Sequence, residues 1–159
     1  MVDNGSDSQA MPEPKGSIMP LEPVSALSII ASAISIAASI KQIMSDSRVD
    51  FTQALRIFGK KATPKQNALL QDAKFRDSIS GLLVISPKLL KQLEEEAKAC
   101  EDSYIKDRRK SKTNLDKEKA ELRATQCICN TLRAIMRHND GNLPSDEFAG
   151  YWKSYNCEL

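Results

Sequence analysis

The sequence predicts an all-α protein, a bundle of four to six helices whose first helix is apolar and rich in Ser, Ala and Ile. The stretch Pro23–Ile40 contains no charged side chain. Further along the chain, apolar residues recur at the helical spacings of three and four. Thr63 and Ser86, each followed by proline, are typical helix starts. A chain of 159 residues with this composition is expected to bury one core.

The first predicted helix carries serines at intervals of 3, 4, 3 and 4, which places their hydroxyls on one narrow stripe. The remaining circumference is almost entirely apolar, so protein or lipid must enclose this helix. At about 1.5 Å per residue, the uncharged stretch Pro23–Ile40 spans roughly 27 Å as a helix, just short of the roughly 30 Å hydrocarbon core of a bilayer. Both a buried helix of a soluble bundle and a membrane-inserting helix therefore remain open. The serines, expected to pack against other helices, are Ser25, Ser28, Ser32, Ser35 and Ser39.

Residues 1–22 are expected to form a disordered arm, and residues 23–159 a single helical domain. The arm contains prolines and glycines without an apolar period. Its charge is acidic on balance, whereas a secretory leader begins with a basic region. We therefore expect cytosolic synthesis and reduced cysteines.

Helices are expected near 24–45, 64–84, 87–110 and 115–138, with short helices near 49–59 and 146–155. In the fourth long helix Leu115, Leu122, Cys129 and Met136 recur at intervals of seven, which predicts a buried seam. The short C-terminal helix carries an aromatic cluster that is expected to pack on the bundle. The predicted core positions include Leu93, Leu122 and Leu132.

The cysteines do not form a recognisable metal site. Residues two apart on a helix point about 200° from each other, so Cys127 and Cys129 cannot share one ion with His138. Cys100 and the second of these cysteines lie on apolar seams and are expected in the core, whereas Cys157 is expected near the surface. With a single histidine and no Gly-rich phosphate loop, no catalytic constellation can be assembled. We expect no metal, no cofactor and no enzymatic activity.

A basic segment separates the third and fourth long helices, and five of the nine residues 106–114 are basic. This segment is either an ordinary solvated turn or a contact for anions. Basic residues near an anionic bilayer contribute roughly 1 kcal/mol each. Nucleic acid binding would normally add aromatic platforms or a recognition helix, and neither is interleaved here. Lipid headgroups are the expected partner, contacted by Lys106, Arg108, Arg109, Lys110 and Lys112.

The order of an apolar first helix followed by amphipathic helices resembles the HeLo-type and bacterial HeLo-like four-helix cell-death domains over residues 24–138. In that group a regulatory segment or sensor is tethered to the bundle, and activation releases an N-terminal helix that perturbs membranes. The resemblance implies that Val24–Ile40 is the inserting helix and that residues 1–22 are the tether. The present chain differs by its arm before the helix and by the lack of an evident signalling domain.

These observations lead to two hypotheses. The first is a non-enzymatic, pore-forming or membrane-perturbing bundle that is cytoplasmic and relocates to the inner face of the membrane. Its expected partners are anionic lipids, further copies of the chain and an unidentified regulatory protein, but not nucleic acid. The alternative is a soluble oligomerising adaptor whose serine-rich helix stays in the core. The residues expected to face lipid are Leu27, Ile29, Ile30, Ile34, Ile36 and Ile40.

Overall fold

A computed structural model describes residues 22–158, so the expected arm lies outside the described residues except for Glu22. This part of the chain forms seven α-helices and no strand, which confirms the all-α class. The helices are α1 (Pro23–Ser47), α2 (Phe51–Lys61), α3 (Pro64–Leu70), α4 (Ala73–Leu82), α5 (Pro87–Lys110), α6 (Asn114–Arg137) and α7 (Asp146–Ser154).

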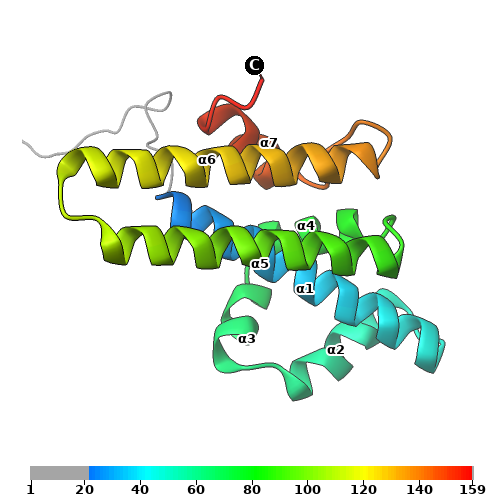
Figure 1. The fold of residues 1–159 in the computed structure, drawn as a ribbon. Helices are drawn as coiled ribbons and strands as arrows, with labels where there is room; N and C mark the ends of the chain where they lie inside the picture. The colour runs from blue at the N-terminus through cyan, green and yellow to red at the C-terminus, as the bar shows by residue number, and fades with distance from the viewer. Residues whose placement is uncertain (1–21, 159) are drawn as a thin grey trace, which may run out of the picture.

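The apolar helix α1 is the centre of the bundle. It packs against α5, α2, α4 and α6, and α5 and α6 form a long antiparallel hairpin beside it (Figure 1). Burying so many apolar side chains of one helix requires neighbours on several sides, because its apolar surface is not confined to one stripe. Its buried residues are Ala26, Leu27, Ile30, Ala31, Ala33, Ile34, Ile36, Ala37 and Ile40.

The helix starts predicted from Ser or Thr before Pro are confirmed. Thr63 forms a capping box with Gln66, in which each side chain accepts a hydrogen bond from the backbone N–H of the other residue, at 3.1 and 2.9 Å. Ser86 Oγ accepts from the N–H of Leu89 at 3.3 Å, and proline occupies the first turn of both helices. Residues close in sequence thus supply the hydrogen-bond partners of the N–H groups at these helix starts. The positions of both helix starts can therefore be predicted from the sequence.

The prediction of a single long helix near 64–84 is wrong, because this part of the chain forms two helices, α3 and α4. Asp72 is the cause: its side chain accepts a hydrogen bond from the N–H of Lys74 at 2.9 Å and caps a new helix. On the other side of the break, Arg76 Nη1 donates to the Leu70 carbonyl oxygen at 2.5 Å. This bond satisfies a carbonyl group that the end of α3 leaves without a helical partner.

The predicted seam of α6 is also wrong in its N-terminal half. Leu115 and Leu122 are each 59% exposed, so neither is a core residue. The buried stripe of this half runs through Ala120 and Ala124 instead, and Ile128 continues it. Small alanines let neighbouring helices approach closely. The leucines at intervals of seven suggested a different buried stripe, so the alanine stripe was not predicted. Further along the bundle, the predictions that Leu93 and Leu132 are buried are confirmed.

Truncating a core leucine should destabilise the protein far more than truncating a leucine of the outer face. We expect Leu132→Ala to lower the free energy of unfolding by about 2–5 kcal/mol, because this side chain is fully buried. Leu122→Ala should change it by less than about 0.5 kcal/mol. Chemical denaturation of both variants measures the difference, and equal losses would contradict the assignment of the outer face.

Gly81 marks the closest approach between α4 and the segment before α7. A Cβ atom at this position would overlap the Pro144 carbonyl oxygen and lie 2.7 Å from its carbonyl carbon. Both atoms belong to the backbone, so no side-chain rotation can relieve the contact. Glycine is therefore required here by the packing of α4 against this segment, not by an unusual backbone angle.

Gly81→Ala should therefore destabilise the protein by at least about 1–3 kcal/mol, because a backbone segment must shift to make room. Gly150→Ala is the matched control, since a Cβ atom there meets nothing within 4 Å. Gly150 lies inside α7, so alanine should stabilise it by up to about 1 kcal/mol. Thermal unfolding should shift in opposite directions in the two variants.

Candidate functional site

The residues expected to face lipid are enclosed by the protein. Leu27, Ile30 and Ile34 are fully buried, as are Ile36 and Ile40. The sixth residue, Ile29, is partly buried and packs against the same core. The structure therefore brings these side chains together at the centre of the bundle.

By length and composition α1 is the one helix of the described residues able to cross a membrane. Its most apolar 18-residue window has a mean hydropathy of 1.9, and half of that window is buried inside the protein. The core helix of a soluble protein has the same properties. Length and composition therefore do not distinguish a core helix from one that crosses a membrane.

The serine stripe lies at the edge of the buried surface of α1. Ser25 and Ser39 are exposed, and the other three serines are partly buried. Ser35 hydrogen-bonds to Glu94 on α5. Partial burial of Glu94 opposes its ionisation, but hydrogen bonds from Lys98 and Ser35, together with the positive charges of Lys98 and Lys91, keep its pKa below the usual value. The stripe therefore provides a polar contact between α1 and the α5–α6 hairpin.

Lys41 forms the second polar connection of α1 to the bundle. Its Nζ donates to the carbonyl oxygens of Leu83 and Ile85, each at 2.6 Å. These carbonyls follow the end of α4, where helical partners are lacking and a cation is electrostatically favoured. Lys41 directly follows the uncharged stretch, so a charge-assisted bond fixes one end of the apolar segment.

The basic segment lies at the end of the α5–α6 hairpin that points away from the α4–α5 connection (Figure 1). Its five basic side chains are all exposed: Lys106, Arg108, Arg109, Lys110 and Lys112. The nearby Asp107 forms an ion pair with Arg123 of α6 at 2.8 Å. An acidic side chain of this region is thus already paired within the hairpin, which leaves the exposed surface basic in character.

The expectation that the cysteines are reduced is wrong. Cys100 and Cys127 form a disulfide between α5 and α6, and Cys129 and Cys157 join α6 to the C-terminal segment. Cys157 is also buried, contrary to its expected place near the surface. The predicted divergence of the two α6 cysteines is correct, and each one reaches a different neighbour. Two divergent cysteines on one helix, together with an even number of cysteines in the chain, were the signal for two bridges.

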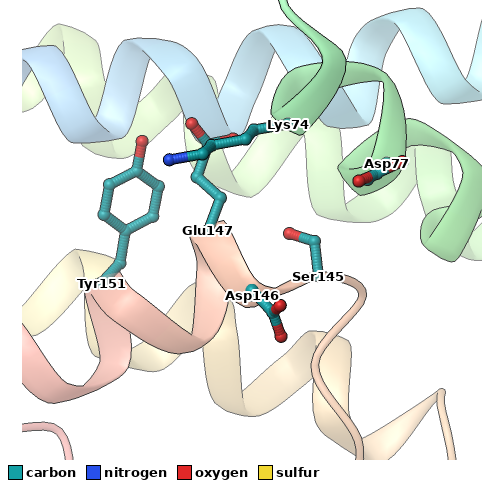
Figure 2. Close-up of a pocket in the computed structure, with 6 residues that line it drawn as sticks. All are labelled: Lys74, Asp77, Ser145, Asp146, Glu147 and Tyr151. Carbon is teal, nitrogen blue, oxygen red and sulfur yellow. The ribbon is translucent and has the colours of Figure 1, made fainter.

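A surface pocket between α4 and α7 was missed from the sequence. It has a volume of about 700 Å³ and is lined by Lys74, Asp77, Ser145, Asp146, Glu147 and Tyr151 (Figure 2). Beneath it, the buried Ser78 Oγ lies 2.6 Å from Ser145 Oγ and 3.2 Å from Glu147 Oε1. Ser145 also caps α7 by accepting from the N–H of Phe148. This hydroxyl network fastens α7 to α4.

Residues 22–158 contain no group of three or more His, Cys, Asp or Glu side chains placed to hold a metal ion. Comparison with protein-family models, with curated proteins and with solved structures finds no match to this chain. The resemblance to HeLo-type domains therefore stays a prediction.

Glu147 should make the stability of the protein depend on pH. Burial raises its pKa above 4.5, its ordinary value, and the negative charge of Asp72 adds to the shift, while Ser78 and Lys74 oppose it. The folded state therefore binds its proton more tightly than the unfolded state, and stability falls as pH rises above about 4.5. Glu147→Gln should remove this fall.

The test compares unfolding of wild type and Glu147→Gln by denaturant at a series of pH values. The two proteins should be similar well below pH 4.5, where the carboxyl group is protonated in both states. The variant should gain stability relative to wild type as the pH approaches neutrality. A constant difference across this range would contradict the raised pKa.

Proposed function

We propose that this chain is a non-enzymatic membrane-acting bundle in which α1 leaves the core and inserts into a bilayer. The observation that carries this proposal is the placement of the covalent cross-links. Both disulfides lie between Cys100 and Cys157, in α5, α6 and the C-terminal segment. No cross-link involves α1, so this helix can separate while the hairpin and C-terminal segment stay joined.

The energetics of the two environments also support the proposal. Transferring the apolar surface of α1 from a protein core to hydrocarbon costs little, since both environments exclude water. Lys41 lies at the end of the apolar stretch, where its long side chain reaches the headgroup region while its stem stays in apolar surroundings. The basic hairpin end would supply attraction to anionic headgroups.

Oligomerisation belongs to the same proposal. In a bilayer the serines of α1 would form a small-residue face on which copies of the helix approach closely and hydrogen-bond. Inserted helices from several copies would then enclose their hydroxyls and present isoleucines to lipid. A trigger, either a regulatory protein or the membrane itself, would have to break the contacts of Lys41 and Ser35.

The disulfides bear on where this activity would occur. The expected cytoplasmic location rested on an N-terminal segment unlike a secretory leader, and reduced cysteines were expected to follow from that location; the paired cysteines do not agree with this expectation. Disulfides persist mainly in oxidising compartments. We therefore propose contact with an anionic leaflet that faces an oxidising compartment.

The alternative is a soluble oligomerising adaptor in which α1 never leaves the core. The observation in its favour is the full burial of nine residues of α1, including most of those expected to face lipid. In this case the serine stripe only allows close packing against α5. The two functions differ in one respect that can be measured, the release of α1.

Cross-linking α1 to α5 should abolish membrane activity without unfolding the protein. In Ser35→Cys/Glu94→Cys, a short bifunctional thiol reagent would join the two helices, because these side chains hydrogen-bond in the native protein. The native cysteines are already paired and do not react. We expect wild type to release dye from anionic liposomes and the cross-linked variant to release almost none.

Asp107→Cys/Arg123→Cys, treated in the same way, is the matched control. These two side chains form an ion pair at 2.8 Å, and the link joins α5 to α6 without restraining α1. This variant should release dye like wild type. If wild type releases no dye, or if the variant joined through α1 releases it undiminished, the adaptor is the better description.

A further inference from the structure

Residues 22–158 cover the outer face of α6 along only part of its length. In the C-terminal half, Cys129 is buried beneath the segment to which its disulfide is attached. Arg133 donates to the Cys157 carbonyl oxygen at 3.0 Å, and its guanidinium carbon lies 5.5 Å from the ring centroid of Trp152. This half of the face is an ordinary intramolecular interface.

The N-terminal half of the same face carries two large apolar side chains that residues 22–158 leave exposed. Leu115 and Leu122 lie seven residues apart and therefore project on the same side of α6. Among the described residues, the other large apolar side chain with comparable exposure is Val84, which is 66% exposed and lies before the start of α5. Two of three such side chains thus share one helix face, which is more than isolated exposure explains.

The hairpin end that carries the two leucines is basic on balance. Residues 106–123 contain eight basic and four acidic side chains, and one of the acidic residues, Asp107, is paired with Arg123. Lys119 and Glu118 lie on the same side of α6, between the two leucines, and the basic excess comes from the end of α5 and the turn that follows it. We call the leucines and the exposed basic residues around them the hairpin-end surface. It consists of Leu115, Leu122, Lys106, Arg108, Arg109, Lys110, Lys112 and Lys119.

We propose that the hairpin-end surface docks on an anionic bilayer, with both leucines entering the interface and the basic side chains contacting headgroups. This inference rests on the proposed function and adds the first contact that precedes release of α1. Exposed apolar side chains among lysines and arginines are the combination by which proteins lie on anionic membranes. Docking would remove the leucines from water and neutralise the basic excess at the same time.

A second copy of the chain fits this surface less well. Two partly exposed leucines offer far less area than the roughly 1,200–2,000 Å² buried in a stable protein interface. Pairing the same surface on two copies would also bring two basic clusters together, which is electrostatically unfavourable. Neither difficulty applies to an anionic bilayer, because its binding does not require a large protein interface and its charge is opposite to that of the basic residues.

The orientation of the docked protein is consistent with insertion of α1. The first turn of α1 lies toward the hairpin end of the molecule, whereas the helix runs away from that end as it proceeds (Figure 1). Glu22, immediately before α1, interacts electrostatically with Tyr104 of α5, close to Arg108. Docking therefore places the start of the apolar helix near the bilayer.

Leu115→Ser/Leu122→Ser should weaken binding to anionic vesicles without affecting the fold. We expect flotation with phosphatidylserine–phosphatidylcholine vesicles to show roughly tenfold weaker binding or more, because the lost contacts are apolar. The unfolding temperature should stay near that of wild type, since both side chains are largely exposed. The matched control, Val84→Ser, should bind like wild type.

The dependence of vesicle binding on salt concentration distinguishes the contribution of the leucines from that of the basic residues. The double leucine variant should keep its dependence on ionic strength, whereas Arg108→Gln/Arg109→Gln/Lys110→Gln should bind more weakly and lose most of that dependence. Equal binding of the double leucine variant and wild type would overturn the inference. So would failure of wild type to bind anionic vesicles, or a wild-type dimer that the leucine substitutions dissolve.

The variant with α1 cross-linked to α5 separates this inference from the proposed function. It should dock on anionic vesicles like wild type, because the hairpin-end surface is unchanged. If wild type docks but releases no dye, the docking inference stands and the insertion of α1 fails. If the double leucine variant releases dye as efficiently as wild type, insertion stands and the docking inference fails.

Discussion

The enclosure of α1 is the constraint on which the rest of the structure depends. Pro23–Ile40 carries no charge and little polarity, so water must be excluded from almost the whole circumference of the helix. One partner helix cannot do this, and α1 is accordingly packed against α5, α2, α4 and α6. The shorter helices α2 and α4 cover sides of α1 that the α5–α6 hairpin leaves open.

The helix α6 has a different role, because disulfides join it to its neighbours. Cys127 ties it to α5, and Cys129, two residues later and on another side, ties it to the C-terminal segment. Loops closed by disulfides restrict the unfolded chain and stabilise the folded one, commonly by about 2–4 kcal/mol each. The protein therefore combines a covalently joined half with a half held by packing, Lys41 and Ser35.

The features that the sequence predicted correctly are those with a local cause. Residues next to Thr63 and Ser86 determine their helix starts, and α1 is apolar enough to be identified without its neighbours. The errors arose where tertiary context decides. Leu122 has the spacing of a core leucine, but it is exposed because the C-terminal segment covers only the other half of that face of α6. The pocket between α4 and α7 depends on residues nearly seventy positions apart, such as Ser78 and Ser145.

Because core and hydrocarbon both exclude water, apolar burial alone does not decide where α1 lies. The deciding contributions are polar. Charge-assisted hydrogen bonds such as those of Lys41 contribute roughly 1.5–3 kcal/mol and are lost when the helix leaves the α4–α5 connection. Headgroups offer the same ammonium group replacement acceptors, but only once the protein is held at a bilayer. A surface that holds the hairpin at a bilayer would therefore shift the equilibrium of α1 from the protein core toward the bilayer without contacting α1. Docking and insertion are for this reason separable steps.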